Sequence, residues 1–209
     1  ATFMEMLAVD AWKPEWRRWD SFTVSRAAAV QGDGLKSTRP IEFPVERPEE
    51  AAGMFDVLTY EKGASVLRML EQYLGADRFR DGIRLYLRRH EYANAETTDL
   101  WDALEDSTKE PARALMDSWI FQAGYPLISV ERKTGDLILS QRIFRYLQDG
   151  DHPERKFHVP VFLRAGTKQA PSATPASITE ITIKVIESVA LTLKSRLDIN
   201  RVRENAPIR

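Results

Sequence analysis

The spacing of the hydrophobic residues changes near residue 125, and this change constrains the fold more than any other feature. Before it, apolar residues recur at helical spacing, as in the stripe formed by Val57, Leu58, Val66, Leu67, Leu70 and Leu74. After Tyr125-Pro126, residues 127–132 and 157–163 follow the two-residue alternation that is typical of strands. The 209-residue chain therefore predicts an α+β, multidomain fold with a domain boundary between residues 124 and 125.

Local signals divide the first part into short helices. We expect helices over 1–13, 15–30, 49–74, 77–89, from Thr97 onward, and from Pro111 to Gly124, with an irregular connection over 35–48. Pro14 and Gly75 are expected to end two of these helices. In the second part, strands are expected over 127–132, 137–139, 157–163 and 178–193, with a loop over 166–177.

Composition narrows the classes of function. Lys plus Arg number 30 and Asp plus Glu number 31, so the chain lacks the basic surplus of a dedicated nucleic-acid binder. It has no apolar run long enough to span a bilayer and no signal-peptide pattern at its start, so no membrane partner is expected. The absence of cysteine excludes a disulfide framework and a thiolate metal site, and it favours a cytoplasmic protein.

The first residues are already in a helical pattern. Ala1-Thr2-Phe3-Met4-Glu5 begins without the Ser, Thr, Asp or Asn that normally precedes a helix. We therefore expect the helix to begin upstream of Ala1 and the chain to be a fragment. The flank on which missing helices would pack should be exposed and apolar around Phe3, Met4 and Leu7.

Several ordered motifs, spread over residues 1–165, resemble one enzyme family. They are Ala1 to Glu5, Phe55 to Leu70, Tyr92 to Trp101, Trp119 to Pro126, Gln141 to Phe144 and Phe157 to Val161. Together they resemble the zinc aminopeptidases of the gluzincin type, the alanyl and puromycin-sensitive aminopeptidase family. The resemblance implies that 1–124 is the C-terminal, α-helical part of a thermolysin-like catalytic domain. It implies that 125–209 is a small antiparallel β-sandwich, truncated or altered after about residue 166.

The same resemblance implies a zinc cofactor whose ligands lie outside this chain. The chain has no His-Glu-x-x-His, and its three histidines, His90, His152 and His158, lack the helical spacing of a zinc pair. In the family, the third ligand is the Glu of an Asn-Glu-Gly-Phe motif, which would lie three residues before Ala1. We therefore expect no metal ligand in this chain and expect the missing upstream region of the same protein to be its partner.

Tyr60 is the candidate catalytic residue. A tyrosine on an amphipathic helix usually packs, but Phe55-Asp56 before it and Lys62-Gly63 after it match the family's motif. The resemblance implies that its phenol, protonated at neutral pH, donates a hydrogen bond to the oxyanion formed on a peptide substrate. The parent protein would remove N-terminal residues from peptides, whereas the chain alone would be inactive.

Other interpretations stay open at this point. A non-catalytic interaction module built on the same fold is the alternative function, and an epoxide hydrolase like the leukotriene hydrolases of the family is a second enzyme class. The arginines of residues 78–89 are expected to form local ion pairs on a solvated helix rather than a nucleic-acid site. The five tryptophans are expected in the core: Trp12, Trp16, Trp19, Trp101 and Trp119.

Overall fold

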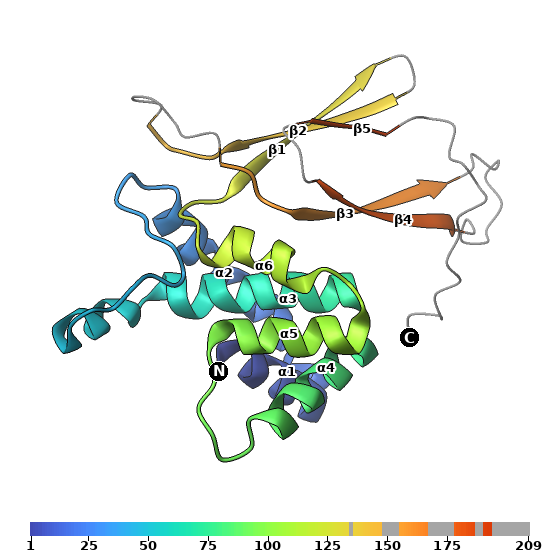
Figure 1. The fold of residues 1–209 in the computed structure, drawn as a ribbon. Helices are drawn as coiled ribbons and strands as arrows, with labels where there is room; N and C mark the ends of the chain where they lie inside the picture. Colours follow the sequence, from blue (N-terminus) through green and yellow to red (C-terminus); the bar gives the residue numbers. More distant parts are fainter. Residues whose placement is uncertain (134–135, 148–154, 167–177, 187–189, 194–209) are drawn as a thin grey trace. The chain divides into compact units, whose positions relative to one another are not determined.

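The structure is a computed structural model, which describes residues 1–133, 136–147, 155–166, 178–186 and 190–193 (Figure 1). The chain forms two compact units. The first combines Ala1–Leu127 with Arg142–His158, and the second combines Ile128–Gln141 with Val159–Arg209. Residues 167–177 of the loop predicted over 166–177 lie outside the described residues, as do His152 and residues 187–189 and 194–209 of the tail predicted to be truncated or altered after about residue 166.

The first unit is helical. Its α-helices are α1 (Thr2–Trp12), α2 (Arg18–Asp33), α3 (Gly63–Leu74), α4 (Ala76–Arg89), α5 (Thr97–Thr108) and α6 (Ala112–Ile120). Two 3₁₀ helices, η1 (Pro14–Trp16) and η2 (Pro48–Met54), and a π-helical turn, η3 (Leu58–Lys62), complete it. Among the described residues, none of the helices is both long and apolar enough to cross a bilayer.

Most predicted helix ends agree with the structure, but the single helix expected over 49–74 is wrong, because η2, η3 and α3 are separate elements there, and α2 continues to Asp33 instead of ending at residue 30. Pro14 follows α1, and Gly75 follows α3 with a φ of +86°, a conformation that glycine adopts without the steric cost of a Cβ. No side chain caps the start of α1, as the sequence predicted. The last helix ends earlier than expected, at Ile120, because the chain turns out of it toward Gly124, whose φ is +87°.

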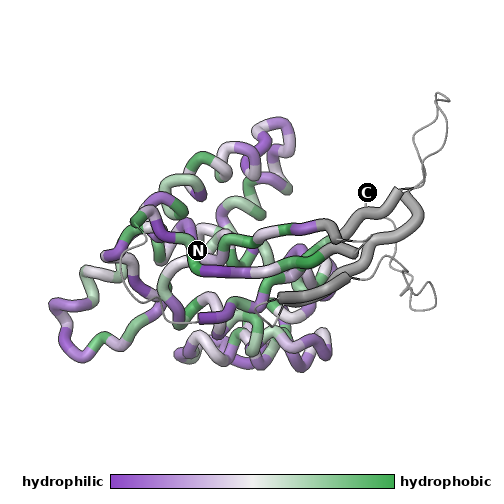
Figure 2. Tube along the Cα trace, turned by 90° about the horizontal axis from the view of Figure 1, so that it is seen from above, coloured by the Kyte–Doolittle hydropathy of each residue, from purple (hydrophilic) through white to green (hydrophobic). Residues whose placement is uncertain are grey.

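The core of this unit lies where the helices meet. It is built from large side chains that are almost fully buried: Phe3, Phe22, Leu70, Phe79, Trp101, Leu104, Leu115 and Met116. Figure 2 shows the hydrophobic positions recurring along the helices between hydrophilic ones, which is the spacing that one buried face requires. The ring of Phe3 packs edge-on against Phe79 at 5.4 Å, so α1 and α4 share one core.

Two expectations about exposure were wrong. Trp12 and Trp16 are 70% and 56% exposed, because they lie where α1 ends and η1 turns away from the core, and they pack mainly on each other. Trp101 is buried as predicted, and Trp19 and Trp119 are partly buried against the core. The expected apolar flank is also absent, since Phe3 is buried, Leu7 packs against the core, and only Met4 of the three is exposed.

Residues 142–147 return to the helical unit after two strands. Tyr125 stacks on Phe144 with ring centres 5.2 Å apart, and Phe144 N–H donates to the Tyr125 carbonyl. Tyr146 N–H donates to the carbonyl of Gly34, where an added Cβ would lie 2.8 Å from the Tyr146 ring. The end of α2 and the exit from α6 are thereby joined by the same short segment.

The described strands form two sheets. β1 (Pro126–Lys133), β2 (Asp136–Ile143) and β5 (Ala190–Leu193) form one, in the order β1-β2-β5; β3 (Val159–Gly166) and β4 (Ile178–Ile186) form the other. Antiparallel pairing places Leu139 opposite Leu191 and Phe162 opposite Ile183. The predicted α+β class, with helices followed by antiparallel strands, is confirmed.

Strands replace helices at Pro126, next to the predicted boundary between residues 124 and 125. The compact units are interleaved in sequence, however, because residues 142–158 group with the helices. The division into domains 1–124 and 125–209 stays a prediction.

A substitution at Gly82 would test how closely α4 packs on α5. A Cβ at this position would lie 2.5 Å from Leu104 Cδ2 and 3.2 Å from Leu104 Cα, and Leu104 is fully buried. We expect Gly82→Ala to lower the free energy of unfolding by about 1–3 kcal/mol, because overpacking outweighs the helix-propensity gain. The change in the free energy of unfolding is measured by urea denaturation of the two proteins.

Gly63→Ala is the matched control, because the nearest atom to its added Cβ is Ile41 Cγ2 at 3.9 Å. It should leave stability unchanged or raise it by up to about 1 kcal/mol. Equal effects of the two substitutions would contradict the close packing of Gly82 on Leu104.

Candidate active site

Tyr60 lies in the π-helical turn η3, which continues directly into α3. A π-turn inserts one extra residue into a helix and is frequent at functional sites. The Tyr60 side chain is 38% exposed, and its ring lies 6.4 Å from that of Phe55. The next residue but one, Lys62, is 6% exposed, so η3 directs one polar side chain outward and the other into the protein.

The start of η3 is held by Asp56. One carboxylate oxygen of Asp56, Oδ1, accepts from the backbone N–H groups of Leu58 and Thr59 at 2.9 and 3.1 Å. These are orphan donors of a helical start, and an aspartate before the helix satisfies them. Arg39 Nη2 donates to the same Oδ1 at 2.6 Å and to Thr59 Oγ1 at 3.0 Å.

The end of η3 is held by a buried ion pair. Lys62 Nζ lies 2.7 Å from Asp33 Oδ2 and donates to the carbonyl oxygen of Gly124 at 2.9 Å. Asp33 Oδ1 accepts from Thr38 Oγ1 at 2.6 Å and from the N–H of Gly124 at 3.0 Å. Burial lowers the pKa of the Lys62 ammonium, while the adjacent Asp33 carboxylate opposes that shift.

The network around Lys62 requires a glycine at position 124. Its positive φ favours glycine, and an added Cβ would lie 2.7 Å from Arg145 Nη1. Arg145 in turn donates to the backbone carbonyl of Asp33. The Asp33–Lys62 network therefore joins the end of α2, the π-turn and the exit from α6.

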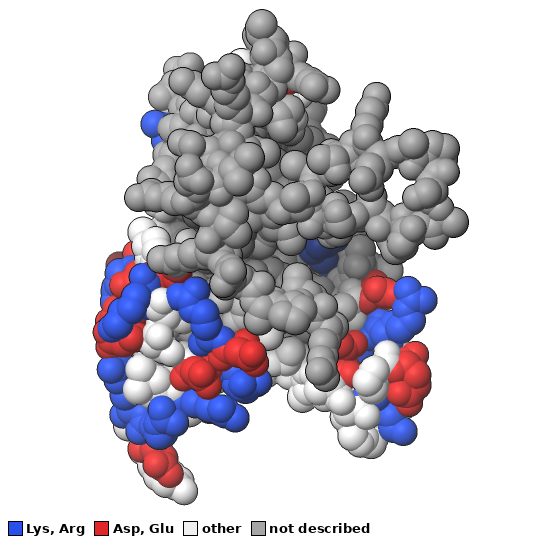
Figure 3. Space-filling view, turned by 90° about the vertical axis from the view of Figure 1, so that its right-hand side faces the viewer, with Lys and Arg blue, Asp and Glu red and all other residues white. Residues whose placement is uncertain are grey.

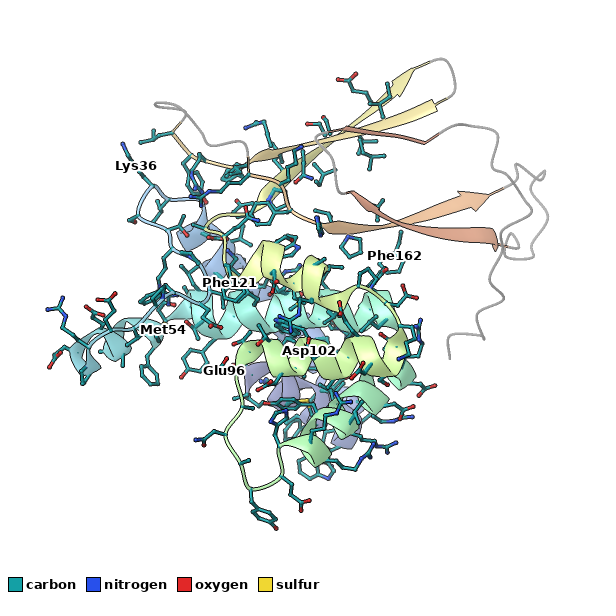
Figure 4. The ribbon with its side chains drawn as sticks, in the orientation of Figure 1. Lys36, Met54, Glu96, Asp102, Phe121 and Phe162 are labelled. Atoms are coloured by element: carbon teal, nitrogen blue, oxygen red, sulfur yellow. The ribbon has the colours of Figure 1, made fainter. Side chains whose placement is uncertain are left out.

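Tyr60 forms part of the wall of a pocket of about 470 Å³ in the helical unit. Ala1 and Thr2, at the start of the described chain, line the same pocket, as do Gly63 and Ala64, whose small size leaves room beside Tyr60. Met54 and Glu96, labelled in Figure 4, also line it and come from η2 and from the residue before α5. Trp101 lines it too, and its buried indole N–H has no hydrogen-bond partner among the described residues.

The described residues do not fit a zinc ion. They contain no group of three or more His, Asp or Glu side chains close enough to hold a metal. His90 directly follows α4 and its ring lies 5.2 Å from that of Tyr86, whereas the backbone of His158 forms hydrogen bonds with Ser118 and Trp119. A zinc site needs four ligands, at least three of them from the protein, so a zinc ion would need ligands from outside these residues.

The arginines of α4 form ion pairs, as predicted. Arg80 pairs with Asp77, Arg84 with Asp81, and Arg89 with Asp106 on α5. Figure 3 shows acidic and basic side chains interspersed over the described part of the face in view. Mixed charge of this kind gives that part of the surface no field of a single sign.

Comparison with known proteins identifies the class to which this fold and pocket belong. The model of the peptidase family M1 domain matches residues 1–119, more than half of the chain. The chain belongs to peptidase family M1. The family resemblance predicted from the motifs is confirmed.

Individual relatives extend the match. The chain is 42% identical over 167 residues to Aminopeptidase M1 of Arabidopsis thaliana, covering 80% of this chain and 19% of that protein. It is 41% identical over 162 residues to Tricorn protease-interacting factor F2 of Thermoplasma volcanium, covering 77% and 20%. It is 39% identical over 171 residues to the mitochondrial Aminopeptidase 2 of Saccharomyces cerevisiae, covering 80% and 18%. The chain thus spans about a fifth of the length of these relatives.

The sequence singled out Tyr60 but missed the residues around it. Asp33, Lys62 and Gly124 are separated by up to 91 positions, and only the fold brings them together. One signal was available, because Lys62 lies within the apolar stripe, four positions after Leu58 and four before Val66, and so falls on the core side of the helix. A charge in such a position predicts a buried partner.

Asp117 on α6 gives a pH-dependent prediction. Its Oδ1 is buried without a hydrogen-bond partner among the described residues, and burial raises the pKa of the carboxyl. Arg113 opposes this shift, and Glu105 and Asp102 add to it. Because the pKa of Asp117 is higher in the folded than in the unfolded state, the ionised carboxylate destabilises the folded state at pH values above the folded-state pKa. This penalty disappears as the pH falls below the unfolded-state pKa, where the carboxyl is protonated in both states. Asp117→Asn should therefore raise stability at pH 7 by less than about 1 kcal/mol, and the gain should shrink toward pH ~4.

Urea midpoints between pH 4 and 7 measure this effect. Asp81→Asn on α4 serves as the control, because that carboxylate is exposed and paired with Arg84, and its removal should change stability by about 0.5 kcal/mol or less. A loss of stability in Asp117→Asn at pH 7 would refute the assignment.

Proposed function

We propose that this chain is part of a zinc aminopeptidase that removes N-terminal residues from peptides, and that Tyr60 is its oxyanion-binding tyrosine. The observation that carries the proposal is the pocket lined by both Tyr60 and Ala1. Residues immediately upstream of Ala1 would start at the same pocket wall. Zinc ligands provided there, outside residues 1–209, would lie close to the Tyr60 phenol.

The chemistry of Tyr60 fits this role. Attack on a peptide carbonyl places negative charge on its oxygen, and a phenol O–H aimed at that oxygen stabilises the transition state more than the substrate. One such donor contributes about 2.7–4 kcal/mol in enzymes of this type of chemistry. The exposure of Tyr60 to the pocket leaves its hydroxyl accessible to a peptide.

The relatives support the reaction class, since two of the three described above are named aminopeptidases. The third is named for an interaction with the tricorn protease, which concerns that protein. For this chain the proposed partners are a peptide substrate and the zinc-binding region of the same polypeptide, in the cytoplasm. Nucleic acid and membrane are not among the proposed partners.

A non-catalytic interaction module on the same fold is the second candidate. It is favoured by the lack of a metal-binding cluster among the described residues. The coding sequence upstream of Ala1 separates the two candidates. His-Glu-x-x-His followed by Asn-Glu-Gly-Phe supports the enzyme, whereas its absence supports the module.

The chain by itself is predicted to hold no stoichiometric zinc and to have no aminopeptidase turnover, because water activation depends on the metal. Metal analysis of the purified chain and an assay on an aminoacyl chromogenic substrate measure both. One zinc per chain together with metal-dependent turnover would contradict the proposal that the ligands lie outside residues 1–209.

In the protein that carries the zinc ligands, Tyr60→Phe should reduce kcat by about 10²–10³-fold and leave zinc content unchanged, because the phenol contacts the transition state and not the metal. Steady-state kinetics and metal analysis provide the readouts. Tyr73→Phe on α3 is the control and should keep wild-type turnover, since its hydroxyl donates to Glu110. Unchanged turnover in Tyr60→Phe, or loss of zinc, would remove Tyr60 from the catalytic role.

A further inference from the structure

The π-turn that carries Tyr60 is held at both ends by different means. At its start, the Asp56 carboxylate accepts hydrogen bonds from the backbone N–H of Leu58 and from Arg39, and Arg39 also donates to the Thr59 hydroxyl. These groups are exposed or partly buried. At its end, the Asp33–Lys62 pair is more than nine-tenths buried. The start keeps contact with solvent, since the side chains of Arg39 and Asp56 are 19% and 41% exposed, whereas the buried charges of the Asp33–Lys62 pair must keep each other as partners. The buried pair is therefore the stricter of the two constraints on the turn.

The bonding around Lys62 restricts rotation of the turn. Its ammonium contacts Asp33 and the carbonyl of Gly124, while the N–H of Gly124 donates back to Asp33. Three groups from three separate segments thus close a ring of hydrogen bonds about Nζ. Lys62 follows Tyr60 by two positions, and their different exposures show that they point to opposite sides of η3.

We propose that Lys62 and Asp33 are positioning residues for Tyr60, because their buried ion pair fixes the rotation of the π-turn and so directs the phenol into the pocket. The catalytic part of this proposal rests on the proposed function. The positioning part concerns only the geometry of η3. Lys62 and Asp33 act through Tyr60 and are assigned no contact with substrate.

A purely stabilising role explains the buried Asp33–Lys62 pair less well than a positioning role does. Well-packed apolar residues often replace a buried ion pair without loss of stability, because desolvation offsets the attraction between the charges. An ion pair with fixed hydrogen bonds, however, restricts direction as well as distance. Direction is what a donor to a developing oxyanion requires.

The first test uses the 209-residue chain and does not depend on activity. Tyrosine labelled with ¹³C in the ring gives a separate signal for Tyr60 among the six tyrosines, assigned by its loss in Tyr60→Phe. Lys62→Met should shift this signal and raise amide exchange of residues 57–63 on the order of ten-fold. Arg84→Met, which breaks the exposed pair with Asp81, should change neither.

A double variant separates positioning from stability. Asp33→Asn combined with Lys62→Met removes both charges, while Asn keeps an oxygen to accept from Gly124 and Thr38. The urea midpoint should recover toward wild type, whereas the Tyr60 signal should stay displaced. If the Tyr60 signal and the exchange rates recover together with the midpoint, the pair is only structural and the proposal is overturned.

Thr38→Val provides the milder variant in case Lys62→Met does not fold. It removes a single hydrogen bond to Asp33 Oδ1 and keeps both charges. A displaced Tyr60 signal at an unchanged urea midpoint supports the proposal. An undisplaced signal in a folded Thr38→Val chain contradicts it.

The second test is kinetic and uses the protein that carries the zinc ligands. Lys62→Met should reduce kcat by about 10²-fold with little change in KM, because a misdirected catalytic group costs rate more than binding. The double variant Tyr60→Phe/Lys62→Met should be no slower than Tyr60→Phe alone. Additive losses would show that Lys62 does not act through Tyr60. Unchanged turnover in Tyr60→Phe would instead refute the proposed function and leave the geometric test valid.

Discussion

The contact between Asp33 and Lys62 is the interaction on which the arrangement of the helical unit depends most. Both side chains are removed from water, and each charge is tolerable only with its partner in place. Because Asp33 ends α2 and Lys62 ends the π-turn, the pair fixes two segments that no local interaction would bring together. Gly124 closes the network from a third segment with its own N–H and carbonyl groups.

This network also explains why the chain returns to the helices after its first two strands. Arg145 and Tyr146 bond to the backbone at the end of α2, and Phe144 stacks on Tyr125. The close approach is possible because Gly34 and Gly124 have no side chain at the points of contact. Phe144, Arg145 and Tyr146 thus contact the segments that carry the buried network, and residues 142–158 group with the helices, which interleaves the two compact units in sequence.

The pocket next to Tyr60 has a mixed character that suits a peptide. Its wall combines apolar side chains such as Ile41 and Leu67 with the carboxylates of Glu42 and Glu96 and the phenol of Tyr60. Apolar walls with a few directed polar groups are typical of ligand sites. Under the proposed function the occupant of this pocket would be a peptide. The chain belongs to peptidase family M1 and covers about a fifth of the length of its relatives.

The sequence by itself determined the class of the fold, most helix ends and the candidate catalytic residue. These follow from local physics: hydrophobic spacing sets the type of element, proline and glycine end helices, and Tyr60 lies in a short contiguous motif. Tertiary structure alone decided that Trp12 and Trp16 are exposed. Their spacing is that of a buried helical face, but they lie at the end of α1 and in η1, where the chain turns away from the core. It alone decided that Asp33, Lys62 and Gly124 meet, because contacts between residues up to 91 positions apart depend on packing of the whole unit, which no local pattern encodes.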